Sequence, residues 1–306
     1  MRWSIIVCTH NRAAYLKKNL PHLDALEYPR SEYEIIVVDN ASTDDTPAVV
    51  KEVGCGIIYI FEQTAGLSHA RNRGIESANG ELVAFIDDDA WPEQDWLQQL
   101  EKGFVDKKVA CVGGKVLPDW EAGRVSWPDW VHPLLVAQYS ITGYGEIERS
   151  TTYPNIPAGT NIAFRKCVLS SIGGFRPDLG RLGSCLISGE EGEMCLRVQQ
   201  AGYLIVYLPY AVVHHLIPEQ RLTQEWLLSR CYWQGISSAI VERSVFTKKT
   251  LLFRTMRFAV LLVAALLATP VLVLISPKLR FFCRCQKALW RAYLLEMLRR
   301  TGNATS

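Results

Sequence analysis

The sequence lacks the features that mark several common functional classes. Its 306 residues carry a formal net charge of only +2, so charge gives no argument for a nucleic-acid partner, and we expect none. A GxGxxG loop, which a dinucleotide-binding enzyme needs after its first strand, is absent, because that position reads THNRAAY. The same segment lacks the glycine-rich, basic loop that usually holds a triphosphate in nucleotidyltransferases.

The cysteines form no disulfide framework. There are 9 of them, an odd number, and the close pair Cys283 and Cys285 lacks the CxxC spacing of a zinc or redox site. We therefore expect reduced thiols in a cytosolic compartment. The opening MRWSIIVCTHNR reads as a buried strand at 4–8 followed by polar residues, and we do not interpret it as a signal peptide.

Apolar strands alternate with helical patterns in the first third of the chain. Leu16, Leu20 and Leu23 recur at helical spacing between two short apolar runs. This alternation is typical of an α/β fold with a mostly parallel sheet covered by helices, a Rossmann-like arrangement in which ligands bind at the carboxyl ends of the strands. We expect strands at 4–8, 34–38, 57–61 and 82–86, and helices at 12–26, 44–53 and 67–78.

The middle of the chain is less regular. Residues 113–160 are rich in tryptophan, proline and glycine, and we expect an irregular segment that lies over the sheet. Segments of this length inside compact domains are usually functional. Regular patterning then resumes, with helices expected at 189–201 and 222–241 and apolar stretches at 203–207 and 211–215.

The C-terminal region contains an uncharged run of 18 residues, 258–275, which meets the lower limit for a membrane span. Both flanks are basic, so the positive-inside rule chooses no orientation, and a helix on an anionic leaflet fits as well as a span. The alternative is a buried core or oligomer helix. We divide the chain into a catalytic domain at 1–220 and a membrane-associating helical region at 221–306, on the cytoplasmic face of a membrane.

Three adjacent acids, Asp87, Asp88 and Asp89, follow the apolar run 82–86. Their mutual repulsion is unfavourable at the end of a buried strand unless a positive group lies among them. Mg²⁺ and Mn²⁺ prefer such oxygen ligands and commonly bind through carboxylates together with substrate phosphates. A solvated acidic turn is the alternative. Arg71 and Arg73, near the start of the preceding helix, are poorly placed for its dipole and favour a bound anion over two ordinary surface arginines.

Together these segments resemble inverting glycosyltransferases of the family 2 type, which have the GT-A fold. The resemblance covers about residues 3–215, in the order SIIVCTHNR, EIIVVDNASTDDT, GLSHARNRGIESANGELVAFIDDDAWPEQDWL, AGTNIAFRKCVLSSIGGF, GEEGEMCLRVQQAGY and AVVHH. It implies transfer of a sugar from a nucleotide-diphosphate donor, a UDP-sugar first among the expectations, to an acceptor hydroxyl. It also implies a divalent cation, Mn²⁺ or Mg²⁺. With a membrane-associated tail, we expect a lipid-linked or saccharide acceptor and a role in cell-surface polysaccharide or glycolipid synthesis.

The resemblance assigns a role to residues that match its motifs. Glu191 matches the catalytic base, although the motif usually has Asp there, and Glu190 is the alternative. His215, rather than His214, is expected near the metal, and Trp91 could stack on a sugar or simply pack. The donor site would comprise Thr9, Asn11, Arg12, Asp39, Arg71, Asp87 and Asp88. The metal site would comprise Asp89, Asp87 and His215. Gly159 and Asn161 would belong to the segment beneath the donor sugar and the acceptor.

Two other functions remain open at the level of sequence. A nucleotidyltransferase would also use metal-bound aspartates on an α/β sheet. A degenerate nucleotide-sugar-binding membrane scaffold would keep the fold without the chemistry. The intact acidic triplet and the Glu190–Glu191 pair favour an enzyme over the scaffold.

Overall fold

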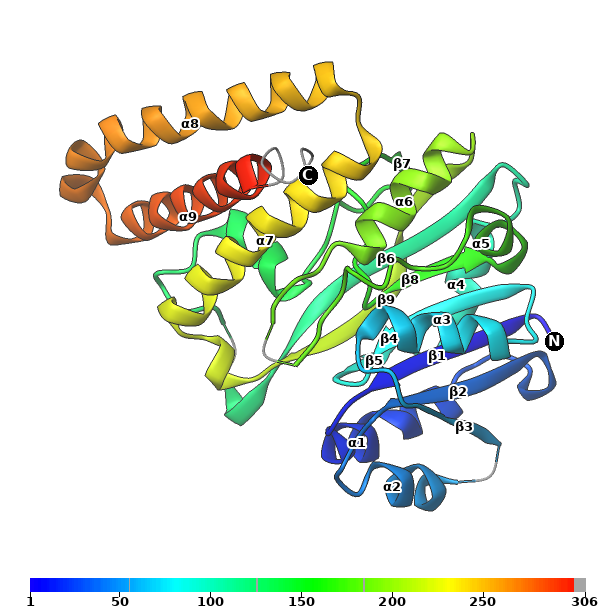
Figure 1. Ribbon diagram of the computed structural model, residues 1–306. Coiled ribbons are helices and arrows are strands. Elements are labelled where there is room, and N and C mark those ends of the chain that lie inside the picture. The colour runs from blue at the N-terminus through cyan, green and yellow to red at the C-terminus, as the bar shows by residue number, and fades with distance from the viewer. Residues whose placement is uncertain (55, 125, 184, 300–306) are drawn as a thin grey trace.

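A mixed β-sheet with helices on both faces organises the chain (Figure 1). The computed structural model describes all residues except 55, 125, 184 and 300–306, and the side chains of 122 and 268–275 are also left out. Within the described residues the sheet has nine strands, in the order β3-β2-β1-β4-β8-β6-β9-β5, with β7 paired to β9. The α/β fold expected from the sequence is confirmed.

The first four strands run parallel to one another. The order in which the chain adds them to the sheet reverses at β1. The chain moves outward from β1 to β2 and β3 and then returns to place β4 on the other side of β1. Ligands bind at such a switch point, in the crevice between the carboxyl ends of the two strands. The elements are β1 (Trp3–Thr9), α1 (Ala13–Asp24), β2 (Tyr33–Asn40), α2 (Thr46–Val53), β3 (Ile57–Glu62), α3 (Leu67–Ser77) and β4 (Leu82–Asp87).

Both faces of this sheet are buried, which explains the nearly continuous apolar runs. Alternate residues of β1 point to opposite faces, with Ile5 and Val7 in one core and Ile6 in the other. Helices α1, α2 and α4 (Trp96–Lys102) cover the first face, and α3, α5 (Lys166–Ile172) and α6 (Glu190–Gln200) cover the second.

The second half of the sheet combines one long parallel pairing with several short antiparallel ones. Strand β8 (Ile162–Arg165) pairs antiparallel with β4 and with β6 (Val109–Trp120), and β6 runs parallel to β9 (Leu204–Ile217). The short strands β5 (Ala90–Pro92) and β7 (Arg149–Thr151) pair with β9. The described residues also form short 3₁₀ segments: η1 (Arg30–Glu32) before β2, and η2 (Glu121–Gly123), η3 (Pro133–Tyr139) and η4 (Glu219–Arg221) in the second half of the chain.

Two sequence expectations need correction here. Residues 113–120 belong to β6, so the expected irregular segment at 113–160 begins later and includes η3 and β7. The apolar stretches 203–207 and 211–215 form one strand, β9, with a register shift opposite Gly114 and Lys115. A Cβ on Gly114 would lie 1.7 Å from the Ala211 carbonyl oxygen, so this close approach needs glycine.

Three helices follow the sheet: α7 (Gln224–Val245), α8 (Lys248–Ile275) and α9 (Pro277–Arg299). Helix α9 packs against both α7 and α8, and α8 contains the whole uncharged run (Figure 1). Buried Glu242 of α7 accepts hydrogen bonds from Arg254 of α8 and from the Tyr293 hydroxyl of α9, at 2.8 Å for Tyr293. This carboxylate therefore joins the three helices.

The approach of α7 to α9 gives a first testable prediction. A Cβ on Gly235 would lie 2.1 Å from the Leu289 carbonyl oxygen, whereas a Cβ on Gly192, in α6, would meet Tyr153 at an ordinary 3.4 Å. We expect Gly235→Ala to lower the free energy of unfolding by about 1–3 kcal/mol relative to Gly192→Ala, because the two helices must move apart. Chemical denaturation of both variants measures the difference, and equal stabilities would contradict this close packing.

Candidate functional site

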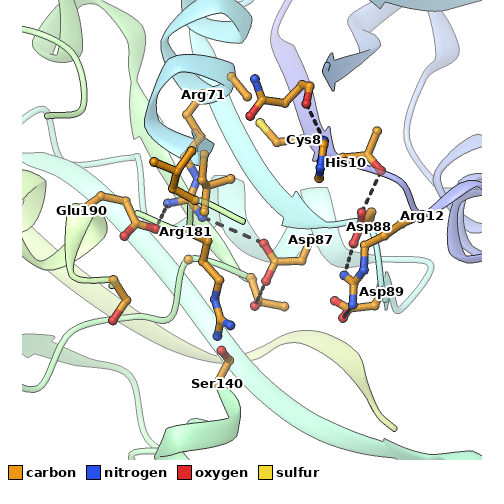
Figure 2. A pocket seen from close by; sticks show the side chains of 18 of the residues that line it. Cys8, His10, Arg12, Arg71, Asp87, Asp88, Asp89, Ser140, Arg181 and Glu190 are labelled. Atoms are coloured by element: carbon orange, nitrogen blue, oxygen red, sulfur yellow. Dashed lines mark hydrogen bonds and ion pairs between the residues drawn. The ribbon is translucent and has the colours of Figure 1, made fainter. Parts of the chain in front are cut away.

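A cavity of about 350 Å³ lies at the carboxyl edge of the sheet, where β1 and β4 end (Figure 2). Its floor includes Thr9 and the acids Asp87, Asp88 and Asp89, so the switch point of the sheet and the acidic triplet coincide. Its other walls come from the start of α3, from η3, from the start of α6 and from α7. The cavity is the place where segments far apart in the sequence meet.

Asp88 is held by the end of β1. It accepts a hydrogen bond from the Thr9 hydroxyl at 2.8 Å and one from Arg12 at 2.5 Å. Burial raises the pKa of Asp88 to about 6, with Arg12 opposing the shift and Asp89 adding to it. Asp88 therefore serves chiefly to anchor Arg12 beside the site.

Asp89 is surrounded by two arginines and a histidine. Its carboxylate lies 2.9 Å from Arg12 Nη2, 3.2 Å from His215 Nε2 and 3.3 Å from Arg221 Nη2. Burial alone would raise its pKa, but His215, Arg12 and Arg221 hold the pKa of Asp89 well below its usual range. Asp89 is therefore an ionised carboxylate in the interior.

Asp87, Asp89 and His215 form a candidate metal site, with one ligand atom from each lying within 4.8 Å of the others. His215 Nδ1 is 2.9 Å from the Tyr139 carbonyl oxygen, so Nδ1 carries a hydrogen and donates it. Nε2 is then the ring nitrogen that faces the Asp89 carboxylate, and it is the atom through which His215 would bind a divalent cation. The Thr160 hydroxyl donates to Asp87 and fixes its orientation. These residues fit a divalent metal.

Arg71 lies beneath the cavity and links its two acidic groups (Figure 2). Its guanidinium bonds Glu190 at 2.7 Å, lies 3.9 Å from Asp87 and packs over the rings of Phe85 and Phe175. A Cβ at Gly159 would lie 2.7 Å from Arg71 Nη2, so glycine leaves room for this side chain. Arg71 is 3% exposed, and its charge acts on the protein's own carboxylates.

Glu190 and Glu191 open helix α6 and both line the cavity. Burial raises the pKa of Glu190 to about 7, the negative charge of Glu191 adds to the shift, and Arg71 opposes it. Each carboxylate keeps one buried oxygen, Oε2, that has no hydrogen-bond partner among the described residues. A carboxylate pair with unused acceptors and a pKa near neutrality is suited to taking up a proton.

Five residues that the sequence singled out do not line the cavity. Arg73 forms an ion pair with Glu76 at 3.5 Å on the exposed side of α3. Asn11 binds the turn after β2, accepting from the Thr43 amide at 2.7 Å. Asp39 accepts from the Ser42 amide and the Tyr59 hydroxyl. Trp91 stacks on His214 with centroids 3.9 Å apart, and Asn161 is fully buried, donating to the carbonyls of Lys115 and Ala211 at the register shift of β9.

The remaining singled-out residues do line it, together with several that sequence reasoning missed. Thr9, Arg12, Arg71, Gly159 and His215 surround the acids, as the motifs predicted. The missed residues had no distinguishing local pattern, because they lie in loops, in η3 and on a helix read only as amphipathic. They are Tyr139, Thr160, Arg181, Arg221, Trp226 and Arg230.

A protein-family model described as glycosyl transferase family 2 matches residues 4–172, more than half of the chain. The chain belongs to this family. The resemblance seen in the sequence is confirmed, and the family 2 enzyme moves sugars from nucleotide sugars.

Curated relatives of this family 2 glycosyltransferase act in glycolipid and polysaccharide synthesis. It is 29% identical over 250 residues to the glucosyl-dolichyl phosphate glucuronosyltransferase of Haloferax volcanii, covering 79% of this chain and 78% of that one. It is also 29% identical over 237 residues to the succinoglycan biosynthesis protein ExoM of Rhizobium meliloti, covering 75% of this chain and 71% of that one.

Solved structures support the fold. The mannosyltransferase PcManGT from Pyrobaculum calidifontis, in complex with GDP-Man and Mn²⁺, has a TM-score of 0.65 at 23% identity, covering 98% of this chain and 88% of that one. TarS 1–349 from S. aureus in complex with UDP-GlcNAc has a TM-score of 0.54 at 18% identity, covering 99% of this chain and 92% of that one. Together they place the chain in the GT-A fold.

The Arg71–Glu190 pair gives a second testable prediction. Arg71→Met leaves the Glu190 carboxylate buried without its cation, which we expect to cost about 3–5 kcal/mol of unfolding free energy. The folded protein binds a proton on Glu190 below pH about 7, so the loss should be larger above that pH than below it. Denaturation on both sides of that pH measures the effect.

Two further variants isolate the pair. Arg73→Met, on the exposed side of α3, should change stability by no more than about 0.5 kcal/mol. The double variant Arg71→Met/Glu190→Gln should be more stable than Arg71→Met, because it removes the unpaired charge. A double variant no more stable than Arg71→Met would show that Arg71 acts by packing alone.

Proposed function

We propose that the enzyme transfers a sugar from a nucleotide-diphosphate donor to an acceptor hydroxyl with inversion at the anomeric carbon. The observation that carries this proposal is the arrangement of the cavity. The Asp87–Asp89–His215 site and the Glu190–Glu191 pair face one space of about 350 Å³, so an electrophile held by one can meet a hydroxyl held by the other.

The donor diphosphate would lie beside Asp87 and Asp89. A divalent cation, Mn²⁺ or Mg²⁺, held by Asp87, Asp89 and His215 would supply charge stabilisation for the diphosphate as it leaves. Arg12 and Arg221 add fixed positive charge there. Thr9 and Asp88 support the donor site by holding Arg12, and we keep Asn11 and Asp39 as parts of the turn that would lie near the nucleoside.

Glu191 is the proposed base, with Glu190 as the alternative. Glu190 is held at 2.7 Å by Arg71, whereas Glu191 forms no ion pair among the described residues, so the Glu191 carboxylate is the one left free to approach an acceptor hydroxyl. In the reaction the acceptor hydroxyl gives its proton to the carboxylate, its oxygen bonds to the anomeric carbon, and the bond from that carbon to the diphosphate oxygen breaks. This single displacement needs no covalent intermediate.

The acceptor and the donor are proposed by analogy with a relative and with solved neighbours. The Haloferax volcanii relative is named for a glucosyl-dolichyl phosphate acceptor, and solved neighbours bind GDP-Man or UDP-GlcNAc. We propose a lipid-linked saccharide acceptor here and a UDP-sugar as the first donor to test, with Gly159 and Asn161 in the segment beneath the donor sugar.

Catalysis gives a third testable prediction. With a donor selected from a nucleotide-sugar panel by thermal shift in Mn²⁺ and Mg²⁺, Asp89→Asn should abolish metal-dependent stabilisation by the donor. Glu191→Gln should keep donor binding and lower turnover by about 100- to 10,000-fold, because only the base is lost. Wild-type turnover should fall below pH about 7, because Glu190 takes up a proton there and the pair then has one fewer proton acceptor.

Each part of this mechanism would be contradicted by a specific result. Near-normal turnover in Glu191→Gln together with a large loss in Glu190→Gln would exchange the two roles. Donor binding without release of nucleoside diphosphate from any donor would support a scaffold, and release of inorganic diphosphate from a nucleoside triphosphate would support a nucleotidyltransferase.

We also propose that helix α8 binds the cytoplasmic face of a membrane. Within the described residues one helical stretch, Lys248–Leu267, is long and apolar enough to cross a membrane, and none of it is buried. Helix α9 returns along α8 and packs on α7, with basic residues such as Arg280 and Arg284 in its sequence, so we favour a helix lying in the interface over a span. The exposed apolar residues are Leu252, Phe253, Met256, Val260, Val263, Leu266 and Leu267.

Membrane binding gives a fourth testable prediction. Val260→Glu/Leu267→Glu removes two exposed apolar side chains and should lower cosedimentation with anionic phospholipid vesicles by about tenfold or more. Val105→Glu is the matched control, because Val105 is 84% exposed but lies in the sheet domain. Equal cosedimentation of all three proteins would rule out α8 as the membrane contact.

A further inference from the structure

Arg230 is a buried cation with unused hydrogen-bond donors. It projects from α7, is 8% exposed and lines the cavity. Its Nη2 donates to the Ser188 hydroxyl and to Gln234, both at 3.1 Å, but Nε and Nη1 have no partner among the described residues. A buried guanidinium with two donors that make no hydrogen bond lowers the stability of the fold, and a bound anion would remove that penalty.

Arg181 is a second cation on the same cavity. No hydrogen bond or ion pair of its side chain is found in the part of the chain that the structure describes. Burial lowers the pKa of Arg181, and burial together with the charge of Arg181 lowers the pKa of Arg230 to about 10. In Figure 2, Arg181 extends past Glu190 and Asp87 toward Ser140. Two neighbouring cations at one cavity favour an anionic ligand.

The protein's own carboxylates do not fill this role. Glu190 is bound to Arg71, and Asp89 to Arg12, His215 and Arg221. The charge of Glu191 acts on Arg230 only at longer range, since the two form no ion pair within 4.0 Å. The charge of the donor diphosphate would be neutralised by the divalent cation proposed above at Asp87 and Asp89. Arg230 would therefore remain without an anion.

We propose that Arg230, assisted by Arg181, binds the phosphate of a lipid-linked acceptor. This inference rests on the proposed function and adds to it a subsite and a chemical class for the acceptor. Guanidinium groups favour phosphate because they donate several charge-assisted hydrogen bonds to its oxygens. The phosphate would then lie next to the Glu190–Glu191 pair, which places the first sugar beyond it near the proposed base.

The position of α7 supports a lipid source for the phosphate. The same helix that carries Arg230 carries Glu242, which holds Arg254 of the apolar helix α8. An acceptor anchored in the bilayer would reach the cavity from the side of these helices. The phosphate of this acceptor joins the lipid to the sugar, and the phosphate would meet Arg230 as the sugar enters the cavity.

A binding experiment tests the subsite without any transfer reaction. The protein is saturated with Mn²⁺ and the nucleoside diphosphate of the donor chosen by the panel, and citronellyl phosphate is titrated by calorimetry. We expect the phosphate to bind beside the nucleotide, citronellol not to bind, and Arg230→Gln to weaken the phosphate by about tenfold or more. Arg181→Gln should weaken it less, because Arg230 provides the main contacts.

Controls separate the explanations. Arg73→Gln removes the same charge from the exposed side of α3 and should leave phosphate binding unchanged. If Arg230→Gln fails to fold, Arg230→Lys replaces it: it keeps the charge but loses the several guanidinium donors, so it should also weaken phosphate binding. Displacement of citronellyl phosphate by the nucleoside diphosphate would assign the arginines to the donor. Three outcomes would overturn the proposal. The first is a phosphate affinity in folded Arg230→Gln or Arg230→Lys equal to that of wild type. The second is tighter binding of a uronic acid than of the phosphate, and the third is no phosphate binding by wild type that holds the nucleotide. Failure of wild type to bind any nucleotide would instead overturn the proposed function.

Discussion

The structure depends on how the acids at the end of β4 are neutralised. A buried strand that ends in three carboxylates is unfavourable by itself, yet Asp88 and Asp89 are 4% and 2% exposed. Arg12 follows β1, His215 comes from β9 and Arg221 from η4, and all three lie against Asp89. The acids can therefore be buried only when the two halves of the sheet and the segment after β9 are assembled around them.

This constraint explains why the three acids differ although they are adjacent in sequence. Asp88 faces β1 and is held by Thr9 and Arg12, so it acts as an anchor. Asp87 and Asp89 point toward His215 and share the candidate metal site. The same logic separates Glu190 from Glu191, because Arg71 contacts only the first. Neighbouring identical charges become different groups when different segments pack on each.

The sequence predicts well what local pattern controls. Strands β1 to β4 and helices α1 to α3 follow from apolar periodicity, and the motifs bring Arg71, Asp87, Asp89, Glu190 and Glu191 to one cavity. It fails where long-range geometry decides. The register shift in β9 looks like a break between two strands, and nothing near Arg181 or Arg230 in the sequence shows that both face the acids across a cavity. Trp91 and Asn161 show that a motif position can also serve packing, through a ring stack with His214 and a hydrogen bond to the Ala211 carbonyl.

Helix α7 forms part of the wall of the cavity and is joined to α8, the candidate membrane contact. Tyr139 and Trp226 line the cavity and stack with ring centroids 4.9 Å apart, and Phe281 and Cys285 of α9 belong to the same buried cluster. The division predicted at residue 220 therefore cuts through contacts that shape the site. Glu242 joins α8 to α7, and α7 carries Arg230 into the cavity. A membrane contact on α8, as proposed above, would therefore act on the helix that lines the site.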